Sequence, residues 1–117
     1  MPISRFSAFI IATAIFQHAA FAADPSQLLG KWIEKFQNGA GMVTEFTATT
    51  ISSYPVNKFG EPTKQPQPSE VSYRDLGNTI GIDFKAGGGI MAMIKDQNNM
   101  VLIFPGMGSR PLTRVEP

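Results

Sequence analysis

The sequence predicts an all-β domain: a small antiparallel up-and-down barrel or sandwich of about eight short strands, preceded by a short helical turn. Short stretches rich in Val, Ile, Thr, Phe and Tyr recur along the chain, and turn-forming residues separate them. In residues 79–85 apolar and polar side chains alternate, as they do in a strand with one buried face. Consecutive strands lie close enough for simple hairpins, and closure into a barrel would remove exposed sheet edges.

The first expected elements are a helical turn and a strand. Asp24 and Pro25 suit the N-cap and the first position of a short helical turn that ends at Gly30. Residues 31–37 then form the first strand, and the Asn-Gly pair that follows is typical of a tight hairpin turn.

Two later connections are longer than hairpin turns. Residues 57–68 contain Pro62, Pro66 and Pro68, which are incompatible with a central strand, and residues 105–111 are rich in glycine. Long loops on a small scaffold often carry recognition, so we expect these two segments to be surface candidates. The other seven strands are expected at residues 42–47, 49–56, 71–76, 79–85, 90–95, 100–104 and 112–115.

Residues 1–22 have the features of a cleavable secretory signal peptide, and we expect residues 23–117 to form one mature domain. Arg5 precedes an apolar run over residues 6–16, which is shorter than the ~20 residues of a membrane-spanning helix. The small-x-small sequence Ala-Phe-Ala comes directly before the expected cleavage site. The sequence therefore predicts a periplasmic or secreted protein of bacterial type, with no stable membrane span after cleavage.

The charge balance disfavours binding to nucleic acid. The chain has ten Lys and Arg residues, one of which is Arg5, and nine Asp and Glu residues, so residues 23–117 carry nine of each. These charges are interspersed, whereas a nucleic-acid binder needs a concentrated positive surface to offset phosphate charge. The chain also has no Cys, which suits a bacterial exported protein better than an animal domain stapled by disulfides.

Most catalytic and metal-binding chemistries lack their reagents in the mature segment. The single histidine, His18, lies in the expected signal peptide, and there is no Cys, so the available serines have no histidine base. We therefore expect no enzyme activity, no metal site and no cofactor. One alternative is a Cu(I) site made by the thioethers of Met91, Met93 and Met100, although methionine is also a common core filler.

A second alternative is a carboxylate-dependent enzyme. Glu34 and Glu45 lie on neighbouring expected strands, where two carboxylates that face each other would resemble a glycosidase pair. The simpler interpretation is that both are sheet residues, with Glu45 opposite Lys31 or Lys35. Glu34 shares its expected face with Trp32, which is unusual for a charged residue.

Gly30-Lys31-Trp32 at the start of the first strand and Arg114 in the last strand resemble the lipocalin-like, or calycin-type, small β-barrels. In that family the tryptophan of the first strand closes one end of the barrel and a late arginine stacks on it. The resemblance implies structural roles for Gly30, Trp32 and Arg114, with the guanidinium covering the indole face by a cation–π contact. It also implies a barrel whose interior is either filled by side chains or open to a ligand.

Together these features predict an exported, non-enzymatic binding protein. It would bind a small apolar ligand in the barrel mouth, or an envelope protein partner through its loops. Tyr54, Phe59 and Tyr73 are the candidate contact residues for either role. An inhibitor or immunity-type protein and an envelope structural protein are the alternatives within the same class.

Overall fold

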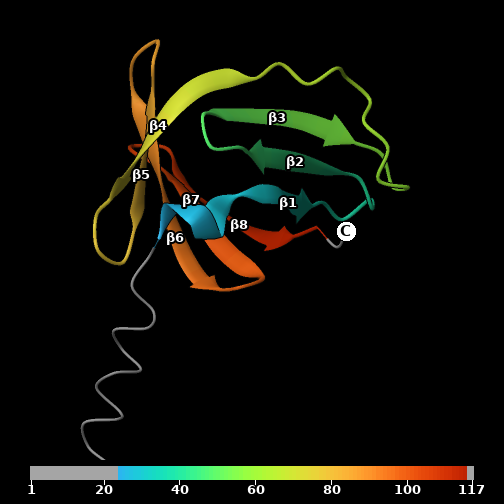
Figure 1. The fold of residues 1–117 in the computed structure, drawn as a ribbon. Coiled ribbons are helices and arrows are strands. Elements are labelled where there is room, and N and C mark those ends of the chain that lie inside the picture. Colours follow the sequence, from blue (N-terminus) through green and yellow to red (C-terminus); the bar gives the residue numbers. More distant parts are fainter. Residues whose placement is uncertain (1–23, 116–117) are drawn as a thin grey trace, which may run out of the picture.

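In the computed structural model, which describes residues 24–115, eight antiparallel strands close into a barrel (Figure 1). Each strand pairs with the next along the chain, and the last pairs with the first. This confirms the predicted all-β class and selects the barrel over the sandwich; the expected signal peptide lies outside the described residues. The elements are η1 (Pro25–Leu28), β1 (Gly30–Lys35), β2 (Gly41–Phe46), β3 (Thr50–Val56), β4 (Ser69–Asp75), β5 (Ile80–Phe84), β6 (Gly89–Asp96), β7 (Asn99–Phe104) and β8 (Gly108–Arg114).

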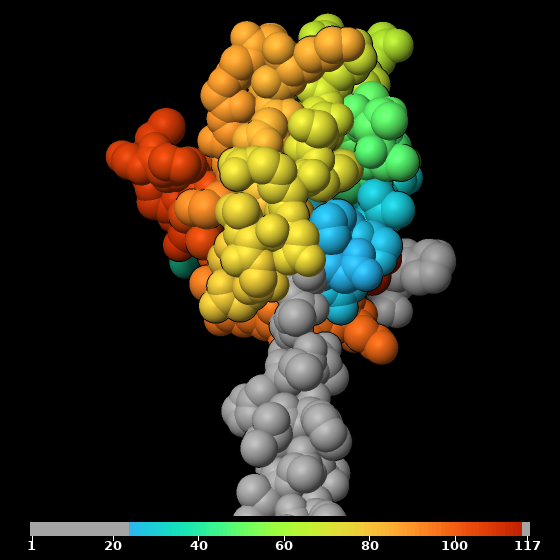
Figure 2. Space-filling view, turned by 60° about the vertical axis from the view of Figure 1, so that its left-hand side comes forward, coloured from blue at the N-terminus to red at the C-terminus, as the bar shows by residue number. Residues whose placement is uncertain are grey.

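The predicted helical turn is a 3-10 helix, η1, with a reciprocal cap. The Asp24 carboxylate accepts a hydrogen bond from the Ser26 N–H at 3.0 Å, and the Gln27 side chain accepts one from the Asp24 N–H at 2.9 Å. Figure 2 shows η1, in blue, seated against the yellow segment that contains β4 and β5. Within residues 24–115 no helix has the length and apolarity needed to cross a bilayer.

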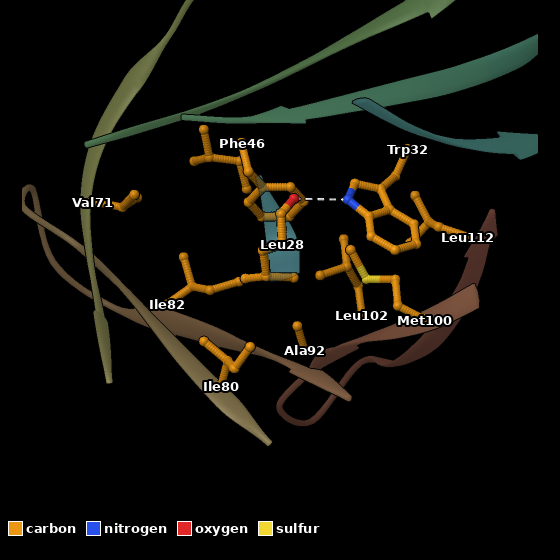
Figure 3. Packing of buried hydrophobic residues seen from close by; sticks show 11 residues of the cluster. Leu28, Trp32, Phe46, Val71, Ile80, Ile82, Ala92, Met100, Leu102 and Leu112 are labelled. Carbon is orange, nitrogen blue, oxygen red and sulfur yellow. Dashed lines mark hydrogen bonds between the residues drawn. The ribbon is translucent and has the colours of Figure 1, made fainter. Parts of the chain in front are cut away.

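The core fills one end of the barrel, beneath η1. Leu28 of η1 and Trp32 of β1 are fully buried, and the Trp32 Nε1–H donates a hydrogen bond to the Leu28 carbonyl at 2.8 Å (Figure 3). The inward side chains of β5, including Ile80 and Ile82, close the core from the opposite side (Figure 3). The remaining buried members of this core are Phe46, Ile51, Val71, Ala92, Met100, Leu102 and Leu112.

The barrel wall has two short seams. β1 pairs with β8 at only two positions, Trp32↔Arg114 and Ile33↔Thr113, and β3 pairs with β4 at only two positions. All other neighbouring strands pair at four to six positions. The wall is one closed sheet in which these seams separate two parts, β1–β3 and β4–β8, and Figure 1 shows the chain crossing from β3 to β4 in a wide arch.

The structure corrects one expected boundary. β8 begins at Gly108, so the predicted loop over residues 105–111 is wrong in its second half, and only residues 105–107 form a turn. Pro111 is accommodated because β8 pairs with β1 only at its C-terminal end, which leaves no ladder partner for Pro111 on that side. In Figure 2 this β7–β8 turn projects from the body as the red-orange segment.

Candidate functional site

The end of the barrel opposite η1 is hollow. A cavity of about 460 Å³ lies among the strand ends that lead into the β1–β2, β3–β4, β5–β6 and β7–β8 connections. This volume lies within the range of about 300–1,000 Å³ that is typical of small-molecule sites. Its apolar lining includes Met42, Ile51, Phe84, Ile90, Leu102 and Phe104.

Small polar residues leave this end unfilled. Thr44 of β2 and Ser53 of β3 are cross-strand partners that occupy inward positions and line the cavity. Their hydroxyl oxygens lie 3.1 Å apart and form a hydrogen bond. This bond satisfies two partly buried hydroxyl groups that would otherwise lose their hydrogen bonds to water. At the closed end the corresponding inward position of β2 holds the bulky, fully buried Phe46. The size of the inward side chains therefore differs along the barrel axis, so one half of the barrel is filled and the other half is hollow.

An ion pair stands on the cavity wall at the β1–β8 seam. The Arg110 Nη1 donates to both carboxylate oxygens of Glu34, at 3.1 and 3.2 Å. The Glu34 side chain is 22% exposed and that of Arg110 is 58% exposed. The pair therefore connects β1 to β8 beyond the two positions at which these strands pair.

The second seam opens the cavity towards the β3–β4 loop. The Val71 N–H donates to the Thr49 carbonyl, so the odd-numbered residues of β4 direct their backbone groups towards β3. In the loop before β4, the Thr63 N–H donates to the Pro55 carbonyl of β3. Extending the register Ile51↔Ser69 by two residues brings Gln67 opposite Ser53.

Proline stops the ladder at that point. Pro66 and Pro68 flank Gln67, and their rings hold φ near about −65°, away from the φ of about −140° of an antiparallel ladder, so β4 does not extend along the rest of β3. Gln67, Ser69 and Ser53 form a polar border to the cavity along this seam.

The residues assigned structural roles lie at the closed end. The Arg114 guanidinium is 4.1 Å from the centroid of the Trp32 ring, which is the stacking that the resemblance implied. Gly30 has a φ of 115°, and a Cβ atom there would lie 3.1 Å from the Arg114 Nη1. A side chain at this position would therefore strain the backbone and displace the arginine. None of these three residues lines the cavity.

Tyr54 is not placed to contact a ligand or partner. It points away from the cavity and is only 6% exposed, in a second apolar cluster with Val43 and Val56. Beside this cluster, Pro62 forms a β-bridge with Val56, so the start of the 57–68 loop folds back along β3. Burial in this cluster leaves no surface of Tyr54 for recognition, and we do not retain it as a contact residue.

Tyr73 and Phe59 lie apart from each other. Tyr73 is half-buried, and its hydroxyl donates a 2.6 Å hydrogen bond to the Thr47 carbonyl; burial raises the pKa of this phenol. Phe59 is 76% exposed outside the barrel, with the Lys58 ammonium 5.3 Å from its ring centroid. Neither residue lines the cavity. Tyr73 holds the β2–β3 turn, and Phe59 remains available on the surface.

The two alternative chemistries find no matching geometry. Glu45 is the partner of Lys31 across β1 and β2, on the face opposite to Glu34, so the two carboxylates do not form a catalytic pair. Met100 is buried in the core, whereas Met91 and Met93 alternate with the inward Ala92 and face outward. In the described part of the chain no three His, Cys, Asp or Glu residues gather as metal ligands.

The sequence reasoning did not identify Arg110 as a site residue. Because residues 105–111 were expected to be a loop, the face of Arg110 was not assigned. Its alternation with Leu112 and Arg114 along β8 is the signal that points it inward.

No family model matches the chain, and neither a curated protein nor a solved structure matches it.

Proposed function

We propose that the mature protein is an exported, non-enzymatic binding protein that holds a small apolar ligand in the open end of a lipocalin-like barrel. The observation that carries this proposal is the cavity of about 460 Å³ above a filled core. Apolar side chains dominate its lining, and a few polar groups stand at its borders, a combination typical of small-molecule sites.

Two further features support the lipocalin-like assignment and the export. Trp32 lies beneath η1 with Arg114 stacked on it, so the barrel is closed at one end only. The order of Arg5, an apolar run and small residues in residues 1–22 supports secretion to the periplasm or beyond.

A neutral, polarity-sensitive dye such as N-phenyl-1-naphthylamine tests the proposal. The purified protein should give a saturable fluorescence signal that small apolar compounds compete away. Ile90→Trp places a bulky ring in the cavity and should weaken dye binding about tenfold or more, which is about 1.4 kcal/mol. Met91→Trp is the matched control, because the next residue of β6 faces outward.

Absence of saturable dye binding would refute the proposal. Equal dye affinity in Ile90→Trp and in the unchanged protein would refute it too, provided that the thermal melts of both variants show an intact fold.

A second candidate function is binding of an envelope protein partner, as in inhibitor or immunity-type proteins or an envelope structural role. The exposure of Phe59, 76%, on the 57–68 loop favours it. A stable complex recovered from envelope extract should then be lost in Phe59→Ser and kept in Met107→Ser, whose parent side chain is 86% exposed on a different turn. Retention of the complex in Phe59→Ser would exclude this loop as the contact.

A further inference from the structure

We propose that the ligand is an amphiphile with a single carboxylate head group, which Arg110 binds at the β1–β8 seam while the tail enters the cavity. This inference rests on the proposed ligand-binding function and specifies the ligand's chemistry. It starts from the hydrogen-bonding capacity of Arg110 that the fold leaves unused.

Arg110 has a free donor edge. A guanidinium carries five N–H donors, and Arg110 uses only its Nη1 on Glu34. Within residues 24–115, the Nε and Nη2 of Arg110 make no hydrogen bond to protein. These two nitrogens form one edge of the guanidinium, and such an edge binds a planar carboxylate through two parallel hydrogen bonds.

The position of Arg110 separates a head group from a tail. Its side chain is 58% exposed, so a bound head group would remain in contact with water. On the inner side the cavity continues between apolar residues such as Leu102 and Phe104. A ligand that matches both environments has one polar end and an apolar chain.

The sign of the charge on the ligand's head group follows from which hydrogen-bonding groups of Arg110 and Glu34 are already paired. Both oxygens of Glu34 already accept from Arg110, whereas the Nε and Nη2 donors of Arg110 have no acceptor among the described residues. Among the described cavity-lining residues Arg110 is the one cation and Glu34 the one anion, and the other polar groups there are neutral. An anionic head is therefore favoured over a cationic one. A monoanion is favoured over a dianion, because Glu34 repels added negative charge.

Glu34 has a positioning role in this arrangement. It holds the Nη1 end of the guanidinium, so the Nε–Nη2 edge is directed away from β1. Its charge also opposes the ligand's charge, so its removal should strengthen anion binding, whereas removal of Arg110 should weaken it. Opposite effects from two residues in contact distinguish this arrangement from a general loss of packing.

Competition for the neutral dye by ten-carbon compounds tests the inference with the whole protein. Decanoate, decanol, decyl phosphate and decyltrimethylammonium are each titrated at low ionic strength, below their micelle concentrations. Decanoate should displace the dye at a concentration about tenfold lower than decanol, as expected for a charge-assisted bidentate pair. Decyl phosphate and decyltrimethylammonium should both be weaker than decanoate.

Three variants locate the effect. Arg110→Gln should abolish the preference for decanoate over decanol, measured as the ratio of the two displacing concentrations within that variant. Glu34→Gln should increase the preference for decanoate over decanol. Lys85→Gln is the control: this exposed lysine lies outside the cavity lining, so the preference should persist.

Equal competition by decanoate and decanol would overturn the inference, as would tighter binding of the phosphate or the ammonium compound. A preference that survives Arg110→Gln would overturn it as well. In each of these cases dye binding itself remains, so the proposed function stands. If no dye binds, the proposed function fails first and the inference fails with it.

Discussion

The Arg114 guanidinium lies 4.1 Å from the centroid of the Trp32 ring and also donates to three backbone carbonyls. These acceptors are Gln97 in the β6–β7 turn, at 2.8 Å, Leu29 at 2.9 Å and Gln27 at 2.8 Å. One side chain near the end of the described chain thus holds the 3-10 turn, a distant hairpin and the core tryptophan together. These contacts join the elements that surround the closed end of the barrel.

Arg114→Lys should lower the free energy of unfolding by about 2 kcal/mol, because a single ammonium cannot reproduce three hydrogen bonds and a planar stack. Urea denaturation measures the loss. Arg110→Lys is the matched control, since Arg110 is 58% exposed and its single ion pair should contribute less than about 1 kcal/mol. Equal losses in the two variants would show that the contacts of Arg114 do not stabilise the closed end.

Tyr73→Phe should destabilise the protein by about 1 kcal/mol, since its hydroxyl connects β4 to the Thr47 carbonyl across the short β3–β4 seam. Tyr54→Phe is the control, because no hydrogen bond from the Tyr54 hydroxyl is found within the described residues. Thermal melts of both variants check this. A larger loss in Tyr54→Phe than in Tyr73→Phe would contradict the role assigned to the Tyr73 hydroxyl.

Stability should fall in acid partly through Asp83. The hydrogen bond from the Arg74 guanidinium, 2.6 Å long, holds the pKa of Asp83 below its ordinary value of 3.8. The folded state therefore favours the ionised carboxylate. Its contribution is present above the ordinary pKa and is lost as the pH falls through the lowered pKa of the folded state.

Melting temperatures from pH 7 down to pH 2 test this linkage. Asp83→Asn should melt below the unchanged protein at neutral pH, and the difference should shrink below about pH 4 as the carboxyl is protonated. A difference that is constant over the whole range would exclude the ion pair as its source. The pKa of Asp96 is also lowered, mainly by the Asn98 backbone N–H, so Asp83→Asn should keep a residual acid dependence.

Replacing Pro66 and Pro68 by Val should slow ligand exchange. Val removes the restriction on φ that the two proline rings impose on either side of Gln67, so β4 is free to pair further along β3 and narrow the polar seam. Stopped-flow dye release should slow roughly twofold or more, as expected for a gated opening. Pro105→Ala, in the β7–β8 turn, is the control. Unchanged release in the double variant would indicate that exchange uses the barrel mouth instead of this seam.

Local sequence patterns predicted most of the fold. The alternation over residues 79–85 placed Ile80, Ile82 and Phe84 on the inner face, and the structure confirms this for β5. The same alternation did not predict where each side chain lies along the barrel axis. Ile82 is fully buried in the core, whereas Phe84 lines the cavity. Alternation assigns a side chain to a face of the sheet, but its position along the barrel axis depends on the tilt and pairing of all eight strands.

The candidate site was less accessible to sequence reasoning. Glu34 was noticed because it shares a face with Trp32, but its partner is 76 residues away in a segment expected to be a loop. Tyr54 has the composition of a contact residue, yet it is buried in a cluster beside the folded-back 57–68 loop. Both outcomes depend on contacts between distant segments, which no local window contains.

By itself the sequence determined the all-β class, most strand positions and the up-and-down order, because these follow from alternation and turn chemistry, and its resemblance to the lipocalin-like barrels implied the stacking of Arg114 on Trp32. Only the tertiary structure decided that the barrel closes with two short seams, that one half is hollow and that Glu34 meets Arg110 across a seam. Strand pattern is set by neighbours along the chain. Cavity volume and seam contacts are set by how the two parts of the barrel wall meet, and that geometry arises only when every strand is in register.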